Sequence, residues 1–278
     1  MYKIVDKKQL NEAVELMVIK APYVARKCEP GQFIILRADN NSERIPLTIA
    51  DYNREEETVT IIYQVVGYST KVLYEKQVGD SVVDFVGPLG KPTELKKHKK
   101  VLGIGGGVGA APLYPQIRKL HEMGVEVDVI LGGRSDEYII LEEEFKAVTK
   151  NLYFATNDGS KGKEGFVTDI LNELIANGEE YDEVIAIGPL VMMKAVVGIT
   201  KPLNIQTAVS LNPVMIDGTG MCGGCRVTVG NEIKFACVDG PDFDGLLVDF
   251  DECLRRQNMY KEEEHSCRIG LEGGQNNA

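Results

Sequence analysis

The pattern of apolar positions changes twice along the chain, and each change indicates a different architecture. In the first ninety residues, apolar positions form short β-branched runs such as 33–38 and 59–66. Gly and Pro residues separate these runs at short intervals. Short strands punctuated in this way are typical of a small antiparallel barrel. We therefore expect the N-terminal part of the chain to fold as an antiparallel β-barrel.

After a basic connector at 94–100, apolar strands alternate with helical stretches. This alternation predicts a five-stranded parallel sheet with helices on both faces, which is an α/β fold. The predicted strands are 101–104, 125–131, 152–156, 184–187 and 205–209. The predicted helices are 110–122, 141–148, 168–176 and 191–200.

Beyond residue 210 the alternation ends, and Gly and Cys dominate 217–237. One further helix is expected near 250–260, and a loose tail at 273–278. The chain therefore divides into three predicted parts, namely a barrel at 1–96, an α/β part at 97–210 and a Cys-containing part at 211–278.

Composition and charge limit the possible functions. Of the 278 residues, 44% are hydrophobic, which is enough for more than one packed core. The chain has neither an apolar run of about eighteen residues nor the apolar stretch of a signal peptide near its start. Its formal net charge of −11 disfavours nucleic acid as a partner, because phosphate binding needs a basic surface. We expect a cytoplasmic protein that binds neither membranes nor nucleic acid.

Three of the six cysteines form a Cys-x2-Cys-x11-Cys cluster among glycines. Thiolates at this spacing bind iron or zinc, and the glycines let the backbone wrap a compact inorganic group. Plant-type 2Fe–2S proteins have Cys-x4-Cys-x2-Cys and a distant fourth cysteine. Here an aspartate stands at the first of these positions. We therefore predict a 2Fe–2S cluster held by Asp217, Cys222, Cys225 and Cys237.

Two alternatives to this ligand set remain open. The first is a structural zinc knuckle, although such sites usually pair two Cys-x2-Cys hooks and a second hook is absent. In the second alternative, Asp217 only begins an Asp-Gly turn. The fourth ligand would then be Cys253 or Cys267.

A glycine-rich segment follows the first strand of the predicted parallel sheet. Its Gly105-x-Gly107-x-x-Ala110 spacing, followed by the predicted helix, fits the alanine-ended fingerprint for a dinucleotide pyrophosphate. Glycines allow close approach of the backbone to the phosphates, and the helix N-terminus supplies N–H groups and a positive dipole. A glycine-rich turn without a ligand is the alternative interpretation.

The loops after later strands provide further candidate nucleotide contacts. Arg134, after the second strand, is placed to contact an adenosine ribose or a 2′-phosphate, whereas Asp128 lies inside that strand. The choice between NAD and NADP therefore stays open. Asp158-Gly159 and Gly188-Pro189 each follow a strand, where ligands of open parallel sheets bind.

Four segments together resemble the ferredoxin–NADP reductase superfamily. Arg44-Ile-Pro46-Leu47-Thr48 looks like its flavin motif, and Gly67-Tyr-Ser69-Thr70 looks like its second FAD segment. Gly107–Pro112 and Gly188–Met193 look like its nucleotide motifs. The resemblance implies that Arg44 pairs with the FAD pyrophosphate and that Thr48 hydrogen-bonds near flavin N5. The cofactor-binding residues predicted for FAD and NAD(H) are Arg44, Pro46, Leu47, Thr48, Ile62, Tyr63, Gln64, Gly67, Ser69, Thr70, Gly105, Gly106, Gly107, Val108, Gly109, Pro112, Arg134, Asp158, Gly159, Gly188, Pro189, Met192 and Met193.

Over nearly its full length, the chain resembles the iron–sulfur flavoprotein subunits of dihydroorotate dehydrogenase, which normally have four cysteines at the cluster. With Asp217 it is more similar to the small subunits of NADH-dependent reduced ferredoxin:NADP oxidoreductases. That resemblance implies an electron-transfer subunit with FAD, a 2Fe–2S cluster and NAD(H), acting in flavin-based electron bifurcation. It also implies a large partner subunit with another FAD and two 4Fe–4S clusters, through which ferredoxin and NADP(H) react.

Two other functions stay open from the sequence. One is the electron-transfer subunit of an NAD-dependent dihydroorotate dehydrogenase. The other is a zinc-stabilised, nucleotide-binding regulatory module without redox turnover. No catalytic acid or base is predicted in any of these cases, because the three histidines show no pairing pattern.

Overall fold

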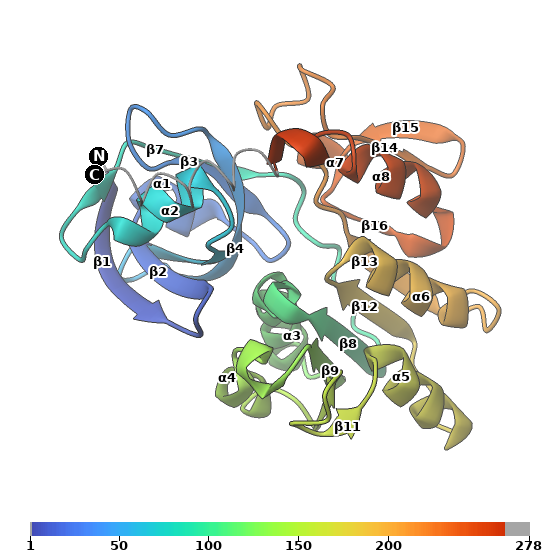
Figure 1. The fold of residues 1–278 in the computed structure, drawn as a ribbon. Coiled ribbons are helices and arrows are strands. Elements are labelled where there is room, and N and C mark those ends of the chain that lie inside the picture. Colours follow the sequence, from blue (N-terminus) through green and yellow to red (C-terminus); the bar gives the residue numbers. More distant parts are fainter. Residues whose placement is uncertain (1, 265–278) are drawn as a thin grey trace.

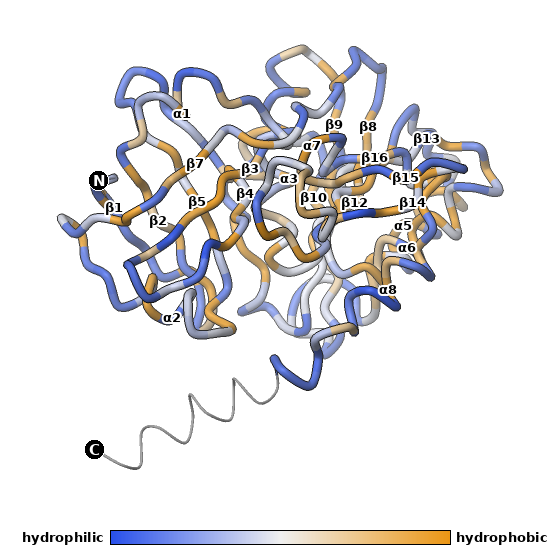
Figure 2. Tube along the Cα trace, turned by 90° about the horizontal axis from the view of Figure 1, so that it is seen from above, coloured by the Kyte–Doolittle hydropathy of each residue, from blue (hydrophilic) through white to orange (hydrophobic). Residues whose placement is uncertain are grey.

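The computed structural model describes residues 2–264, which form a barrel, a parallel sheet with flanking helices, and a C-terminal hairpin segment (Figure 1). The predicted tail at 273–278 and Cys267 lie outside the described residues. Apolar residues concentrate in the strands of both sheets, and polar residues concentrate in the connecting loops (Figure 2).

The N-terminal part is the predicted antiparallel barrel, with seven strands in the order β6-β1-β2-β5-β4-β3-β7. Its interior is filled by side chains such as Ile4, Met17, Ile34, Ile61 and Phe85. The strands are β1 (Tyr2–Gln9), β2 (Val14–Lys20), β3 (Phe33–Arg37), β4 (Ile45–Asn53), β5 (Thr58–Gln64), β6 (Ser81–Val82) and β7 (Asp84–Leu89). Two short helices accompany them, α1 (Pro22–Lys27) and α2 (Tyr68–Glu75).

All five predicted parallel strands are present in the second sheet, in the order β10-β9-β8-β12-β13. They are β8 (Lys100–Gly106), β9 (Glu126–Gly133), β10 (Asn151–Thr156), β12 (Glu183–Ile187) and β13 (Gln206–Ser210). Two more strands extend the edges, parallel β11 (Lys163–Glu164) and antiparallel β16 (Asp242–Asp244). Strands of two and three residues are too short to show a hydrophobic period, so the sequence pattern did not reveal them.

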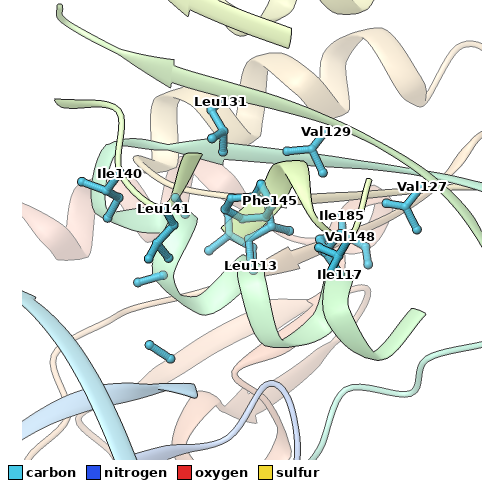
Figure 3. Close-up of a cluster of buried hydrophobic side chains, with 14 of the residues drawn as sticks. Leu113, Ile117, Val127, Val129, Leu131, Ile140, Leu141, Phe145, Val148 and Ile185 are labelled. Atoms are coloured by element: carbon cyan, nitrogen blue, oxygen red, sulfur yellow. The ribbon is translucent and has the colours of Figure 1, made fainter. Parts of the chain in front are cut away.

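Helices cover both faces of this sheet, as predicted. On one face, Leu113, Ile117 and Phe145 pack against Val127 and Val129 (Figure 3). The two helices on this face are α3 (Ala110–Glu122) and α4 (Glu142–Lys146), and the two on the other are α5 (Val167–Ala176) and α6 (Leu190–Thr200). Two 3-10 turns lie at the strand ends, η1 (Gly107–Gly109) and η2 (Asp136–Tyr138).

The C-terminal segment is a hairpin with short helical pieces. It contains β14 (Arg226–Val229), β15 (Glu232–Phe235), α7 (Ala236–Asp239), η3 (Gly245–Leu247) and α8 (Phe250–Gln257). Of these, α8 is the helix that was expected near 250–260. Through β16 the same segment also pairs with β13 of the parallel sheet.

Apolar cores continue between the three parts. Val14 and Ile62 of the barrel belong to the same core as α3 and α4. Phe33 and Ile35 of β3 share another core with Met215 of the C-terminal segment. Since each boundary is filled by buried side chains, the barrel, the sheet and the C-terminal segment hold fixed positions relative to one another.

A buried polar junction also links the three parts. One carboxylate oxygen of Asp242 on β16 accepts hydrogen bonds from the Thr93 hydroxyl at 2.5 Å and from Gln116 Nε2 at 2.9 Å. Thr93 belongs to the connector between barrel and sheet, and Gln116 lies on α3. Burial raises the pKa of Asp242.

Among residues 2–264, no helix has both the length and the apolar character needed to cross a bilayer.

We expect Ile117→Ala to lower the free energy of unfolding by about 2–5 kcal/mol, because it removes a fully buried side chain from the core beneath α3. Urea denaturation followed by far-UV circular dichroism measures the change. Lys119→Ala, at a half-exposed position on the same helix, is the control and should change stability by less than about 0.5 kcal/mol. Equal effects of the two substitutions would contradict the packing described here.

Candidate functional site

The glycine-rich segment forms the sharp turn between β8 and α3. Gly107 has φ +55° and faces open space, so this part of the turn can approach a ligand. In contrast, a Cβ at Gly109 would lie 2.3 Å from the carbonyl oxygen of Ile187. The first turn of α3 follows directly and directs the positive end of the helix dipole at this place, although the Ala110 N–H already donates to the Gly107 and Val108 carbonyl oxygens and Pro112 has no N–H. These features fit a pyrophosphate, as the fingerprint predicts.

The turn between β12 and α6 packs against this glycine turn. A Cβ at Gly106 would lie 2.5 Å from Met192 Sδ and 3.1 Å from Pro189 Cδ. A Cβ at Gly188 would approach the Gly106 Cα to 3.1 Å. The structure thus brings these predicted residues together at the carboxyl ends of β8 and β12. Met193, by contrast, is only 1% exposed and lies in the core under α6.

Three more of the predicted nucleotide residues lie in this turn or directly beside it. Gly105 is confined, because its Cβ would lie 3.2 Å from the Ala110 Cα. Val108 packs against the core shared with the barrel, and Pro112 is half-buried in the first turn of α3.

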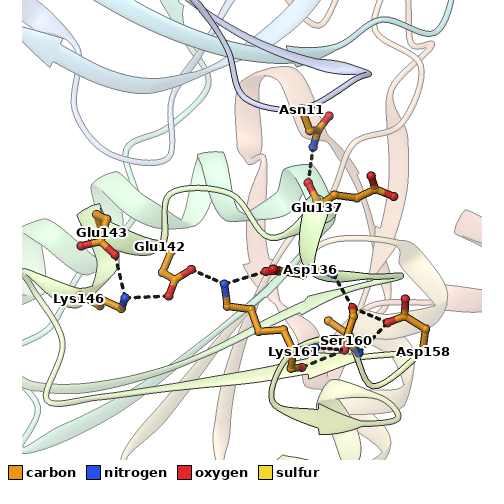
Figure 4. Close-up of polar contacts among 10 residues, drawn as sticks. Asn11, Asp136, Glu137, Glu142, Glu143, Lys146, Asp158, Ser160 and Lys161 are labelled. Carbon is orange, nitrogen blue, oxygen red and sulfur yellow. Dashed lines mark hydrogen bonds and ion pairs between the residues drawn. The ribbon is translucent and has the colours of Figure 1, made fainter.

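The loops after β9 and β10 form a polar corner. Arg134 is exposed, and its carbonyl oxygen accepts a 3.2 Å hydrogen bond from the Asp158 N–H. Asp158 in turn accepts from the Ser160 hydroxyl at 2.6 Å, which lowers the pKa of Asp158 (Figure 4). Gly159, with φ +72°, makes the tight turn between them.

Asp128 takes no part in this corner. It is buried and binds Lys100 Nζ at 3.0 Å, Tyr181 Oη at 3.0 Å and Asn151 Nδ2 at 2.8 Å. These three contacts account for the buried carboxylate, so its position inside a strand does not require a bound ligand.

Sequence reasoning missed the side chains that complete the corner. Lys161 forms ion pairs with Asp136 at 2.7 Å and with Glu142, from η2 and α4 (Figure 4). The barrel also reaches this region, because Asn11 Nδ2 donates to the Glu137 carbonyl oxygen at 3.0 Å. The acidic run at 142–144 was the sign of these side chains in the sequence, but Lys161, the partner of Glu142, is nineteen positions away in the chain.

The segments predicted to bind FAD lie together on the barrel. The Glu43 N–H donates to the Ser69 hydroxyl at 3.1 Å, which joins the loop before β4 to the start of α2. Arg44 is 55% exposed and contacts Asp84 at 2.9 Å. Gly67 faces open space, and its N–H donates to the Thr70 hydroxyl at 3.1 Å. An exposed guanidinium beside a helix N-terminus fits a phosphate-containing cofactor.

The predicted residues on β4 point toward the C-terminal segment. Thr48 and Pro46 lie directly opposite Phe33 and Ile35 on β3, and directly opposed residues of an antiparallel pair share one face. Phe33 and Ile35 pack in the core that contains the cysteines of the C-terminal segment. Leu47, the residue between them, packs against the barrel interior instead.

The three predicted residues at the end of β5 have different surroundings. Ile62 lies in the core between barrel and sheet, and Gln64 is exposed. Tyr63 is buried in the barrel, where its hydroxyl donates to Glu15 at 2.5 Å. Burial raises the pKa of Tyr63. The structure therefore gives Tyr63 a structural partner inside the barrel.

The cysteine loop, residues 217–225, packs between the barrel and α7. Gly218, Gly220 and Gly223 all have positive φ, at 73°, 82° and 68°. A Cβ at Gly218 would lie 2.6 Å from Ile35 Cδ1 on β3. Only glycine therefore allows the loop to bend here and lie against the barrel.

The predicted cluster ligands are neighbours but are not assembled into a closed set. Cys225 Sγ and Cys237 Sγ are 3.2 Å apart, too far for a disulfide. Cys222 is exposed, and its N–H donates to Asp217 at 2.8 Å. The backbone N–H groups of Thr219 and Cys222 lower the pKa of Asp217. Within residues 2–264, no three His, Cys, Asp or Glu side chains converge as a ready-made metal site.

The donor types nevertheless fit an iron–sulfur cluster. Three thiols and one carboxylate lie on one glycine-rich loop and the adjoining helix, and backbone N–H groups already point at sulfur. The Gly224 N–H lies 3.4 Å from Cys222 Sγ, and the Cys237 N–H lies 3.5 Å from Cys225 Sγ. Such contacts stabilise thiolate sulfur.

The alternative ligand Cys253 lies elsewhere. It is buried on α8 in the core that includes α5 and α6, and burial raises the pKa of its thiol to about 11. α8 is linked to the cysteine loop instead by Arg256, whose Nη2 donates to the Gly224 carbonyl oxygen at 2.8 Å.

Two protein-family models match parts of this chain. Residues 212–249 match the iron–sulfur cluster binding domain of dihydroorotate dehydrogenase B. Residues 104–198 match the oxidoreductase NAD-binding domain.

Relatives and a solved structure match almost the whole chain. An uncharacterized protein in the adh 3′ region of Clostridium beijerinckii is 54% identical, covering 99% of this chain and 95% of the relative. A dihydroorotate dehydrogenase B (NAD⁺) electron-transfer subunit homolog of Thermotoga maritima is 44% identical, covering 94% and 92%. A structure of NADH-dependent reduced ferredoxin–NADP oxidoreductase, described for flavin-based electron bifurcation, is 42% identical with TM-score 0.92, covering 98% of both chains.

We expect Gly109→Ala to destabilise the protein by at least about 2 kcal/mol, because its methyl group would collide with the backbone of Ile187. Gly198→Ala on α6 is the control: its Cβ meets open space, so it should be neutral or stabilising by up to about 1 kcal/mol. Urea midpoints of both variants check the difference. Similar midpoints would show that the two turns are not in contact.

Proposed function

This chain belongs to the family of dihydroorotate dehydrogenase B electron-transfer subunits and their homologues, and from that premise we propose that it transfers electrons between NAD(H), FAD and one 2Fe–2S cluster. We further propose that it does so as a subunit of a flavin-based, electron-bifurcating NADH/ferredoxin:NADP oxidoreductase.

One observation carries the proposal, namely that the flavin motif and the cysteine loop both lie against β3. Thr48 and Pro46 are the cross-strand partners of Phe33 and Ile35. These two side chains pack in the same core as Cys225 and Cys237. A flavin held along β4 and a cluster held by the loop would therefore be neighbours, which electron transfer requires.

The three groups differ in the number of electrons that they exchange. A nicotinamide gives or takes an electron pair, an iron–sulfur cluster takes one electron, and a flavin supplies both kinds of chemistry when bound. The chain's own residues contribute binding and orientation. Gly107 and the first turn of α3 would hold the dinucleotide pyrophosphate, and Arg44 with the first turn of α2 would hold the FAD pyrophosphate.

A second subunit belongs to the proposal. The printed names of the relatives describe subunits, and the name of the similar solved structure describes bifurcation with NADH, ferredoxin and NADP. We propose a large partner that carries another FAD and two 4Fe–4S clusters. Ferredoxin and NADP(H) would react through that partner.

The second candidate is the electron-transfer subunit of a dihydroorotate dehydrogenase. The family model over residues 212–249 and the names of several relatives favour it. Asp217, where that family's pattern has a cysteine, favours bifurcation instead. The partner subunit that co-purifies from the native source distinguishes the two candidate functions. Only the partner in a dihydroorotate dehydrogenase would oxidise dihydroorotate.

The central experiment is anaerobic purification followed by visible spectroscopy and metal analysis. The proposal expects FAD and two iron atoms per chain, and bleaching of both absorption bands by NADH. A colourless protein that contains zinc would contradict it and would support the zinc-stabilised regulatory module.

We expect Asp217→Cys to retain a 2Fe–2S cluster with altered paramagnetic resonance g values, because thiolate is a softer ligand than carboxylate. Asp239→Asn is the control and should leave the g values unchanged. Asp239 is near Cys237 in the chain, but it is not a predicted ligand, and its carboxylate accepts a hydrogen bond from the Phe235 N–H. An unchanged signal in Asp217→Cys would remove Asp217 from the ligand set.

We expect Arg44→Ala to weaken FAD binding about tenfold or more, because a charge-assisted hydrogen bond contributes about 1.5–3 kcal/mol. Fluorescence titration of the deflavinated protein measures the dissociation constant. Arg26→Ala, which removes a similarly exposed guanidinium paired with Glu57, should leave it unchanged. Equal FAD affinity in all three proteins would exclude Arg44 from the site.

A further inference from the structure

The corner beyond β9 and β10 contains a lysine whose ammonium group is already paired with two carboxylates. Lys161 Nζ lies 2.7 Å from Asp136 Oδ1 and also contacts Glu142 (Figure 4). Its side chain is only 24% exposed and lies over the ring of Phe154. The hydrogen bonds to Asp136 and Glu142 raise the pKa of Lys161 above its ordinary value. The ammonium group is therefore fixed in position and remains charged.

The same residues line a shallow depression of about 480 Å³. Its charged lining consists of Asp136, Glu137 and Glu142 against Lys161 alone, so it is negative overall. The remaining lining residues are small or apolar: Leu10, Ser135, Ile139 and Ser160. Glu142 is held ionised, because hydrogen bonds from Lys146 and Lys161 lower the pKa of its carboxyl group.

Under the proposed function, this depression lies where the adenosine ribose of the dinucleotide would bind. It follows the carboxyl ends of β9 and β10, next to the strand that carries the glycine turn. At that position in a dinucleotide-binding sheet, a carboxylate accepts a hydrogen bond from a free ribose 2′-hydroxyl, whereas an available arginine accommodates a 2′-phosphate.

We infer that the ion pairs of Lys161 with Asp136 and Glu142 make this site select NAD(H) over NADP(H). A 2′-phosphate brings about two negative charges into a depression whose only lining cation is already occupied. A 2′-hydroxyl, in contrast, can donate to one of the carboxylates. The inference rests on the proposed function and names the residues that determine its nucleotide specificity.

Arg134 does not reverse this charge balance. It is the cation expected from the sequence to meet a 2′-phosphate, but its exposed side chain is not part of the lining of the depression. Bulk solvent and salt screen the exposed Arg134 more than they screen the carboxylate of Glu142, whose side chain is 25% exposed.

Calorimetric titration of the cofactor-loaded full chain tests the inference. The probes are ADP-ribose and 2′-phospho-ADP-ribose, which differ only by the phosphate and need no turnover. We expect ADP-ribose to bind at least tenfold more tightly at low salt, and this ratio to shrink as salt is added. Asp136→Asn combined with Glu142→Gln should release Lys161 and reduce the ratio at least tenfold.

The control for the charge change is Glu143→Gln. Glu143 is the next residue on α4, but it is 82% exposed and pairs with Lys146 rather than with Lys161. It should leave the ratio within twofold of the wild type. Adding Lys161→Met to the double variant should abolish the gained affinity for the 2′-phosphate. If the double variant does not fold, Glu142→Gln alone should lower the ratio at least threefold.

Binding of both probes with less than a tenfold difference in the wild type would overturn the inference alone. An unchanged ratio in the double variant, or an equal change in Glu143→Gln, would also overturn it. If neither probe binds, the result would instead overturn the proposed function, and the inference with it.

Discussion

Packing of the cysteine loop against β3 is the constraint on which the arrangement of the proposed sites depends. Gly218 meets the side chain of Ile35 so closely that any larger residue would push the loop away from the barrel. On the same face, β4 presents Thr48 and Pro46 beside Phe33 and Ile35. Apolar contact thus fixes the distance between the flavin motif and the thiols before any cofactor binds.

Glycines serve two different purposes around the nucleotide turn. Gly106, Gly109 and Gly188 allow the turns after β8 and β12 to touch, so a side chain at these positions would push those turns apart. Gly107 faces open space and leaves room for something outside the protein. A single motif in the sequence therefore combines an internal packing requirement with an external binding requirement, and only coordinates distinguish the two.

Much of the architecture was predictable because it depends on local patterns. The helix expected at 110–122 matches α3, since strand, glycine turn and amphipathic period all agree there. The barrel and the five long parallel strands followed from the same kind of pattern. The short strands β11 and β16 did not, because two or three residues carry no period and pair only through long-range contacts.

The candidate sites were predictable to a lesser degree. Among the motif residues, Gly107 faces open space and Arg44 is exposed, as binding residues must be, but Tyr63 and Met193 point into cores. Alternation along a strand and the turn of a helix decide this, and a motif comparison ignores both. The pairing of Lys161 with Asp136 and Glu142 joins the loop after β10 to η2 and α4, so no short window of sequence contains it.

The junction at Asp242 has a consequence for how the protein could be divided. β16 forms the edge strand of the parallel sheet, and the Asp242 carboxylate on this strand accepts hydrogen bonds from Thr93 and Gln116. The C-terminal segment is therefore bound to both the connector and the parallel-sheet part of the chain. Truncating the chain after β13 would expose an unpaired strand edge and strip two buried polar groups of their acceptor. The iron–sulfur region is therefore not an independent module that could be grafted onto another reductase.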